Sequence, residues 1–528
     1  MPYVLPETDA TERRRIDPAI EMEGISKAFG SVQANRGIRF SVRHGEIHAL
    51  LGENGSGKST LMNILSGIYL PDEGRIRLRG REVVFHSPRD SIDLGIGMVH
   101  QHFKLVEPMS ALDNISMGMG KGLLTDRKGV VARIKAYSQR FGMELDLDKR
   151  VADMSVGEKQ SVEIMKVLYR GADILVLDEP TAVLTPQEIE RLFAILRRMR
   201  EEGASIVFIS HKLNEVMDLC NRVTVLRKGE TIGTVNVAET DPLQLIEMMV
   251  GRAVDLSIER PPIGGAGVCL SVRDLSLRGP DGVKRLDGVS FDLAHGEILG
   301  VAGLAGSGQK ELCESIAGLV RPDAGRILFH EREIIGHSPR EIIRMGVSMS
   351  FIPEDRLGMG LVASMDIADN IMLKDYALYG GFRLDRQSAR RKASSIVERL
   401  SISTPSIFHP VRKLSGGNIQ KVILGREIDL SPKLLVTAYA VRGLDIHSSY
   451  TIYHLLNEQK KKGVAILYVG EDLDVLLELC DRVMVLCGGR MTGIVDARTA
   501  SKERIGLMMT GISEASGTQR SLYEEDPR

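Results

Sequence analysis

A glycine-rich segment, LGENGSGKST at residues 51–60, constrains the fold of this chain more than any other stretch. It fits the phosphate-loop pattern G-x-x-x-x-G-K-[ST], which functions as the turn between a strand and a helix. The apolar run GEIHALL precedes the segment, and TLMNILSGI follows it with helical spacing. The segment therefore predicts a strand, a phosphate-binding turn and a helix that begins near Lys58.

The residue types of this loop suit phosphate and magnesium. Its glycines leave room for backbone N–H groups to surround phosphate oxygens, where a Cβ would obstruct them. Lys58 is expected to contact the β- and γ-phosphates, and Ser59 to offer its hydroxyl to Mg²⁺. The expected nucleotide-binding residues of the loop are Gly52, Asn54, Gly55, Gly57, Lys58, Ser59 and Thr60.

The overall composition predicts a folded protein with more than one core. The chain has 528 residues, of which 43% are hydrophobic and 26% charged, and its net charge is −1. This charge provides no global field that would draw the protein to nucleic acid. Its apolar runs fall short of the roughly 18 residues needed to cross a bilayer, and its first residues do not resemble a secretory signal. We therefore expect a cytosolic location.

The five cysteines predict reduced thiols. They are Cys220, Cys269, Cys313, Cys480 and Cys487. They lack the paired C-x-x-C spacing of zinc sites, and their number is odd. The sequence therefore does not predict a zinc site.

The chain contains two copies of one unit. HGEIHALLGENGSGKSTL at 44–61 reappears as HGEILGVAGLAGSGQKEL at 295–312, and LCNRVTVLRKGE at 219–230 as LCDRVMVLCGGR at 479–490. Short apolar runs alternate with helical segments, which predicts an α/β fold with parallel strands. A helical insert is expected at about 110–150. The predicted boundaries are a polar tail at 1–19, a first domain at 20–255, a linker at 256–267, a second domain at 268–511 and a polar tail at 512–528.

Polar residues follow three further strands of the first copy. Asp178 and Glu179 come directly after the run ILVL, as in a Walker B segment. We expect this pair to face the phosphate loop of the neighbouring strand, with Asp178 holding Mg²⁺ and Glu179 polarising the attacking water. Gln101 ends the run GIGMVHQ and His211 follows SIVFIS. Both are expected on the nucleotide side of a parallel sheet.

The order of these motifs, together with LSGGNIQK at 414–421, resembles that of the ATP-binding cassette (ABC) ATPases. The resemblance occurs once in each copy and so covers nearly the whole chain. The tandem form looks like the fused ATP-binding subunits of bacterial sugar and nucleoside importers of the ribose/galactose and basic membrane lipoprotein type. The resemblance implies two P-loop domains, each with a mainly parallel sheet, a helical subdomain and an antiparallel β part. It also implies that Gln101 senses Mg²⁺ and the permease, that His211 contacts the γ-phosphate, and that Phe29 stacks on adenine.

The second copy departs from this pattern. Gln309 stands where Lys58 stands in the first, Lys310 replaces Ser59, and Ala438 and Tyr439 replace the Walker B acids. Glu354 and Glu471 replace Gln101 and His211. We expect hydrolysis at this copy to fail.

The signature segments show the opposite asymmetry. The second copy has Ser415, Gly416 and Gly417, and Asp445 after its Walker B strand, whereas the first has Val156 and Thr185 at the corresponding places. If the copies pack head to tail, as the resemblance implies, one composite site contains every intact residue.

The resemblance implies an ATP- and Mg²⁺-dependent energy-coupling subunit at the cytoplasmic face of the membrane. Its partners would be polytopic permease subunits and, indirectly, an extracytoplasmic substrate-binding protein, with no nucleic acid. We expect Phe103 to Ile115 to form the permease-facing surface. The alternative is a soluble twin-cassette ATPase acting on ribosomes or DNA. The segment at 97–115 resembles the nucleoside importers more than the sugar importers.

Overall fold

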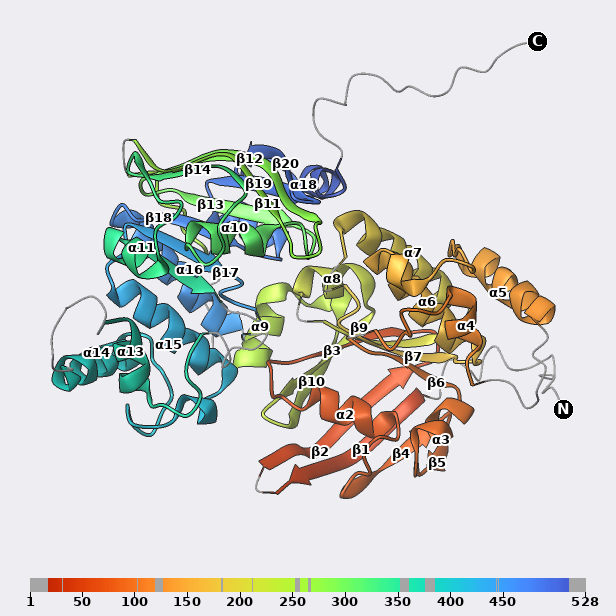
Figure 1. Cartoon of the computed structure of the whole chain (residues 1–528). Coiled ribbons are helices and arrows are strands. Elements are labelled where there is room, and N and C mark those ends of the chain that lie inside the picture. Colours follow the sequence, from red (N-terminus) through yellow and green to blue (C-terminus); the bar gives the residue numbers. More distant parts are fainter. Residues whose placement is uncertain are drawn as a thin grey trace, which may run out of the picture. The chain divides into compact units, whose positions relative to one another are not determined.

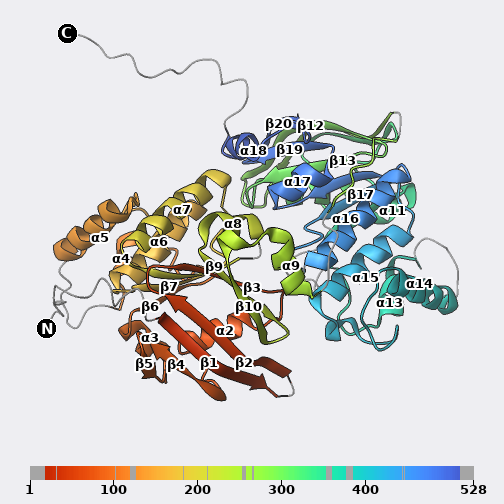
Figure 2. The same cartoon turned by 180° about the vertical axis from the view of Figure 1, so that it is seen from behind.

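The protein is represented by a computed structural model, and its contacts divide the chain into two compact units, Met1–Asp255 and Leu256–Arg528. The residues it describes are 18–30, 32–101, 103–118, 127–181, 184–210, 212–251, 257–264, 267–351, 360–375, 385–442, 444 and 446–511. The predicted site residues His211 and Asp445, and Glu354, lie outside these residues. So do nearly all of the two predicted tails. Figures 1 and 2 show the chain from two sides.

The first unit contains an antiparallel sheet and a mainly parallel one. The antiparallel sheet has, in spatial order, β2 (Val32–Arg43), β1 (Pro18–Phe29), β4 (Glu73–Leu78) and β5 (Arg81–Val83). The other has the order β10 (Glu230–Asn236), β9 (Arg222–Arg227), β3 (Ile47–Leu51), β8 (Ser205–Ile209), β7 (Ile174–Asp178) and β6 (Ile96–Val99). Its strands are parallel except β10. The predicted α/β class is confirmed.

The burial of the parallel strands explains their sequence. Every residue of β3 and of β8 is buried, as expected for strands covered on both faces, which read as continuous apolar runs. Helix α2 (Lys58–Leu65) follows β3 and buries Leu61, Met62, Ile64 and Leu65. These side chains join residues of both sheets in one core, and each contributes about 1.5–3 kcal/mol by burial. The helix that carries the phosphate loop is thereby fixed between the sheets.

The helical insert predicted at about 110–150 is present and extends further. It contains α4 (Ala111–Ser116), α5 (Arg127–Phe141) and α6 (Val156–Tyr169). In both views these helices lie together at one end of the unit, away from the antiparallel sheet (Figures 1 and 2). The other α-helices in the described part of this unit are α3 (Pro88–Asp93), α7 (Pro186–Glu201), α8 (Leu213–Leu219) and α9 (Pro242–Val250).

The second unit repeats this topology. Its antiparallel sheet has the order β12 (Lys284–Ala294), β11 (Val268–Arg278), β14 (Ala324–Phe329) and β15 (Arg332–Glu333). Its other sheet has the order β16 (Val347–Phe351), β17 (Leu434–Ala438), β18 (Ala465–Val469), β13 (Ile298–Gly303), β19 (Arg482–Cys487) and β20 (Arg490–Asp496). The α-helices among its described residues are α10 (Gln309–Ile316), α11 (Pro339–Met345), α13 (Ile367–Asp375), α14 (Arg386–Arg399), α15 (Gly416–Asp429), α16 (Ile446–Lys461), α17 (Leu473–Leu479) and α18 (Lys502–Met509).

The described part of the predicted linker, residues 257–264, is attached to the second unit. The Arg260 guanidinium donates to the carbonyl oxygens of Leu477 and Glu478 near the end of α17. The Asn457 amide of α16 donates to the Glu259 carbonyl oxygen. This stretch therefore packs as part of the second unit.

Candidate functional site

The phosphate loop of the first unit joins β3 to α2, as predicted. Gly57 caps α2 with φ 100, and Gly52 has φ 154. A Cβ on Gly52 would lie 2.3 Å from the Leu226 carbonyl oxygen, and one on Gly57 would lie 2.3 Å from Asn35 Nδ2. Glycine is therefore required at both positions by the packing of the protein itself, in addition to any need to leave space for phosphate.

The Lys58 ammonium lies within this loop. Its Nζ donates to the carbonyl oxygens of Gly52, at 2.6 Å, and Glu53, at 3.0 Å. Burial lowers the pKa of Lys58, and the carboxylates of Glu179 and Asp178 act in the opposite direction. The ammonium is shielded from water, so its attraction for a phosphate is stronger than on an exposed surface.

Asp178 and Glu179 lie at the carboxyl end of β7. The prediction that this strand neighbours the phosphate-loop strand is wrong, because β8 lies between β7 and β3. The carboxyl ends of parallel strands share one edge of the sheet, so the acids and the loop still meet. Burial and the Glu179 charge raise the pKa of Asp178 above 3.8, against the opposing charge of Lys58.

Gln101 and Glu179, both predicted to be catalytic, contact each other. Gln101 follows β6, and its Nε2 donates to Glu179 Oε2 at 2.9 Å. Glu179 has a left-handed backbone with φ 48, and its N–H donates to the Ile209 carbonyl oxygen at 2.9 Å. Such a backbone in a residue other than glycine costs about 1–3 kcal/mol and recurs at functional sites.

A buried carboxylate behind these residues was not found from the sequence. Glu215 Oε2 on α8 accepts hydrogen bonds from the hydroxyls of Thr181, at 2.6 Å, and Ser210, at 3.0 Å. Lys212 pairs with its other oxygen at 3.1 Å. Thr181 follows the Walker B acids and Ser210 directly precedes His211, so Glu215 connects the ends of β7 and β8. The sequence offered no signal for it beyond an acid in a short helix.

The first unit has features that fit a nucleotide. Ser59 is exposed at the start of α2, and Thr60 is half-buried beside it. Asn54 and Gly55 form the exposed tip of the loop. Ser56 Oγ is buried without a hydrogen-bond partner, which is rare for a buried polar atom, and it is a donor that a phosphate oxygen would satisfy.

Phe29, predicted to stack on adenine, is available for that contact. Its ring is 44% exposed at the end of β1. Tyr69, which the sequence analysis did not identify, packs against it edge to face with ring centroids 5.2 Å apart. Together the two rings offer an exposed aromatic surface, on which a base of any kind stacks favourably.

The second unit keeps the loop geometry without the charge. Gly306 and Gly308 have φ 84 and φ 103, close to φ 80 at Gly55 and φ 100 at Gly57. Gln309 Nε2 donates to the Leu304 carbonyl oxygen at 3.1 Å, the contact that Lys58 makes with Glu53. The loop shape therefore does not depend on the lysine.

The second unit also keeps the Walker B backbone without its acids. Tyr439 has φ 57, and its N–H donates to the Val469 carbonyl oxygen at 2.9 Å, as Glu179 does in the first unit. Burial raises the pKa of the Tyr439 phenol to about 12, so it is neutral. Glu471, at the position of His211, lies 3.6 Å from Arg442.

The two signature segments differ by a charge that the sequence analysis overlooked. Ser155 caps α6 and Ser415 caps α15. In the first unit the Glu158 carboxylate accepts from the Ser155 N–H at 2.7 Å and pairs with Lys149 at 2.8 Å. In the second unit the neutral Asn418 takes this place, and its Nδ2 donates to Ser415 Oγ at 2.9 Å. The pattern S-x-x-E, a capping box, is visible in the sequence of the first copy.

The segment Phe103–Ile115 follows Gln101 and is fixed to the helical insert. Val106 and Met109 are 41% and 38% exposed, whereas Phe103 and Leu105 are half-buried. The Val106 N–H donates to Asn114 Oδ1 at 2.7 Å.

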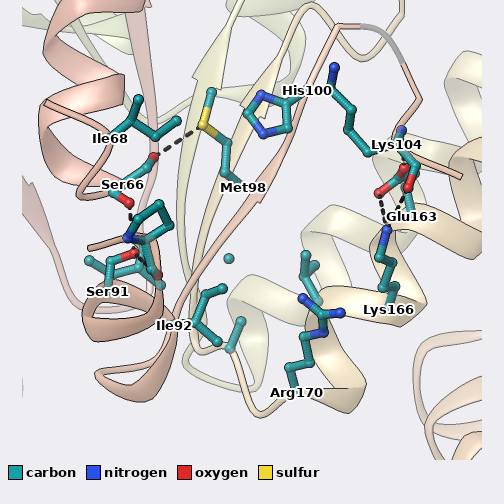
Figure 3. A pocket seen from close by; sticks show the side chains of 15 residues that line it. Ser66, Ile68, Ser91, Ile92, Met98, His100, Lys104, Glu163, Lys166 and Arg170 are labelled. Carbon is teal, nitrogen blue, oxygen red and sulfur yellow. Dashed lines mark hydrogen bonds and ion pairs between the residues drawn. The ribbon is translucent and has the colours of Figure 1, made fainter. Parts of the chain in front are cut away.

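A cavity of about 200 Å³ adjoins this segment. Figure 3 shows Lys104 close to Glu163 and Lys166 of α6 on one side of it, and Ser66, Ile68 and Ser91 on the other. Lys166 Nζ donates to the Lys104 carbonyl oxygen at 2.8 Å. The chain leaving β6 is thereby bonded to the signature helix of the same unit.

Among the described residues, no helix combines the length and apolar character needed to cross a bilayer. All five cysteines are free thiols, as the sequence predicted.

The fold and the site define a P-loop ATPase built from two cassettes. The sequence profile of the family described as "ABC transporter" matches residues 35–182 and 286–437. The chain is 41% identical to the nucleoside import ATP-binding protein NupA of Lactococcus lactis subsp. cremoris (strain MG1363), and the similarity covers 94% of this chain and 98% of that protein. It is equally similar, with the same coverage, to the guanosine import ATP-binding protein NupO of Bacillus subtilis (strain 168).

A third relative is the ribose import ATP-binding protein RbsA 1 of Rubrobacter xylanophilus (strain DSM 9941 / JCM 11954 / NBRC 16129 / PRD-1), 40% identical over 94% of this chain and 99% of that protein. The chain therefore belongs to the ABC transporter family, as an ATP-binding protein with two cassettes. It is an ATPase coupled to transport. The alternative of a ribosome- or DNA-directed ATPase is not favoured.

Proposed function

We propose that this protein is the energy-coupling subunit of an importer for nucleosides or simple sugars. It would act at the cytoplasmic face of the membrane with polytopic permease subunits, and indirectly with an extracytoplasmic substrate-binding protein. The relatives, which are nucleoside and ribose import ATP-binding proteins, support import, and the net charge of −1 gives no attraction for nucleic acid. The nucleoside and ribose relatives are 41% and 40% identical, so identity alone does not separate the two kinds of cargo.

One observation carries the proposal that a single site hydrolyses ATP. The two units share the backbone of the phosphate loop and of the Walker B turn, yet only the first has the charged groups on it. Lys58 would neutralise phosphate charge, and Glu179 would polarise the attacking water. Ser59, Gln101 and Asp178 would hold Mg²⁺, which supplies further neutralisation of the phosphates when bound. His211 would contact the γ-phosphate.

We propose further that the signature segment of the second unit completes this site, in a head-to-tail arrangement of the two copies. Ser415, Gly416, Gly417 and Asp445 would contribute from the opposite side. The signature of the second unit offers a helix N-terminus with the neutral Asn418, and a helix N-terminus attracts anions. The Glu158 carboxylate stands at the same place in the first unit, where it repels a phosphate and binds a backbone donor.

Paired substitutions test both statements. We expect Lys58→Ala and Glu179→Gln to abolish ATP turnover in the assembled transporter, and Gln309→Ala to leave most of it. Ser415→Arg should be as damaging as Lys58→Ala because a bulky side chain would enter the intact site, and Ser155→Arg should be mild. Equal losses from the two serine variants would contradict the arrangement.

We propose that the segment Phe103–Ile115, together with the adjoining cavity, faces the permease. The exposed apolar side chains of Val106 and Met109 support this role, because a surface that binds a partner is enriched in such groups. Val106→Glu and Met109→Glu should uncouple transport from ATP turnover while nucleotide binding is retained. Val84→Glu, at a residue that is 63% exposed in the same unit, is the matched control. Normal coupled transport in the first two variants would refute this role.

A further inference from the structure

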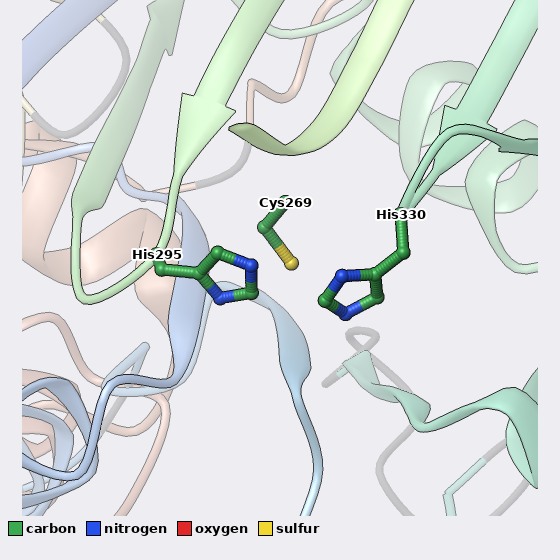
Figure 4. Close-up of side chains that lie close together, drawn as sticks. All are labelled: Cys269, His295 and His330. Carbon is green, nitrogen blue, oxygen red and sulfur yellow. The ribbon is translucent and has the colours of Figure 1, made fainter. Parts of the chain in front are cut away.

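Three side chains from separate parts of the second unit converge at one end of its antiparallel sheet. Cys269 is the second residue of β11, His295 follows β12, and His330 lies in the turn between β14 and β15. Their ligand atoms all lie within 4.8 Å of one another. Figure 4 shows the thiol between the two imidazoles, each of which turns a ring nitrogen toward the sulfur. We propose that Cys269, His295 and His330 form a binding site for Zn²⁺, with water as the fourth ligand.

The donor set suits zinc. Zn²⁺ binds cysteine sulfur at about 2.3 Å and imidazole nitrogen at about 2.0–2.1 Å in tetrahedral sites, and three protein ligands with one water is a common arrangement. Ligand atoms at these distances are separated by roughly 3.5 Å. The three groups therefore need to approach one another by about 1 Å, which small rotations of the side chains provide.

The backbone that carries the ligands is already fixed. The His330 N–H donates to the Cys269 carbonyl oxygen at 3.0 Å, and the His295 N–H donates to the Gly267 carbonyl oxygen at 3.2 Å. Cys269 is 1% exposed, whereas both histidines are only partly buried. A metal ion can therefore reach the thiol from the histidine side. His330 Nε2 is buried without a hydrogen-bond partner, so no hydrogen bond at that nitrogen has to be broken when the ring turns.

The first unit provides an internal comparison. Arg79 is the counterpart of His330 at the same turn, with φ 49 against φ 46. Its N–H donates to the Ala19 carbonyl oxygen at 3.1 Å, as the His330 N–H does to that of Cys269. Arg79 forms an ion pair with Asp173. The second unit has Lys433 at the position of Asp173, and a lysine cannot form this pair with a histidine. The second unit thus has Cys269 and His330 where the first has Ala19 and Arg79, whereas His295 has a counterpart in His44.

Two properties of the site oppose binding and limit its affinity. Burial raises the pKa of the Cys269 thiol to about 12, so the metal has to displace the thiol proton, and one proton is released per ion bound. The Lys433 ammonium lies close enough to act on both Cys269 and His330 and repels a cation. A bound ion would link β11, β12 and the β14–β15 turn, next to the place where the chain enters the second unit.

The test uses the full-length protein, freed of metal by a chelator and without nucleotide, titrated with Co²⁺ and then with Zn²⁺. We expect one Co²⁺ per chain, with a thiolate-to-cobalt charge-transfer band and the visible bands of a tetrahedral site, and displacement by Zn²⁺. Cys269→Ala introduces the residue that the first unit has at Ala19. This variant and His330→Gln should each weaken Co²⁺ binding by more than about 100-fold, because loss of a group that only orients a metal ligand costs about 10- to 100-fold. Cys487→Ser and His337→Gln should leave it unchanged.

Zn²⁺ should also raise the unfolding temperature of the wild-type protein and of Cys487→Ser, but not of Cys269→Ala or His330→Gln. A cooperative thermal transition of the metal-free variants is the control that they are folded. Absence of the charge-transfer band in the wild-type protein would overturn the proposal. Equal Zn²⁺ affinity in the wild-type protein and Cys269→Ala would also overturn it, because the ion would then bind elsewhere.

Discussion

The substitution Lys58→Gln isolates the charge of the phosphate-loop lysine from its structural role. The second unit already contains this substitution as Gln309, and its amide makes the same contact to the loop, at 3.1 Å against 3.0 Å for Lys58. The variant should therefore keep the fold and the loop geometry. The positive charge, one donor proton and the hydrogen bond to the Gly52 carbonyl oxygen are lost.

The size of the effect follows from Coulomb's law. A unit positive and a unit negative charge about 4 Å apart attract each other by about 4 kcal/mol at an effective dielectric constant near 20, the value typical of sites near a protein surface. Each 1.36 kcal/mol corresponds to a factor of about ten. The loss should therefore be about 10³-fold in ATP turnover, provided that Lys58 contacts the transferred phosphate.

The assay compares ATPase rates of wild-type protein, Lys58→Gln, Gln309→Ala and Gln309→Lys in the assembled transporter. Thermal unfolding shows whether each variant is folded. We expect Gln309→Ala to retain most activity. Gln309→Lys should add none, because Ala438 and Tyr439 still replace the acids. Lys58→Gln with more than about a tenth of wild-type turnover would refute the charge argument, because a 4 kcal/mol loss leaves roughly a thousandth.

Three further predictions concern other residues. Burial and the Glu179 charge raise the pKa of Asp178, so acidification should abolish Mg²⁺-dependent ATP binding already above pH 3.8, the ordinary pKa of aspartate. Glu179→Gln should move this loss of binding to lower pH in a fluorescence titration. An unchanged pH of the loss in Glu179→Gln would contradict the coupling between the two carboxylates. Phe29→Ala should weaken ATP binding by about 1–3 kcal/mol, the cost of losing base stacking, and unchanged affinity would exclude stacking. Lys460 is fully buried and pairs with Asp481 at 2.7 Å, so Lys460→Met should reduce the free energy of unfolding by about 3–5 kcal/mol in urea titrations; a loss below 1 kcal/mol would show that the pair is replaceable.

The sequence alone determined the features that depend on local patterns. The phosphate loop requires a particular succession of glycines, Lys58 and Ser59, and this succession defines a strand, a turn and a helix whatever the rest of the chain does. The repetition of the pattern identified two units of one topology. The substitutions Gln309 and Tyr439 could be found by aligning the two copies, and the structure adds that they occupy an almost unchanged backbone.

The tertiary structure decided everything that depends on which strands are neighbours. The sequence cannot report that β8 lies between β7 and β3, because strand order in a parallel sheet is set by long crossover connections. The buried carboxylate of Glu215 acquires its meaning only when the ends of β7 and β8 meet. Cys269, His295 and His330 have no metal-binding spacing along the chain, and only the pairing of β11 with β12 and β14 brings them together.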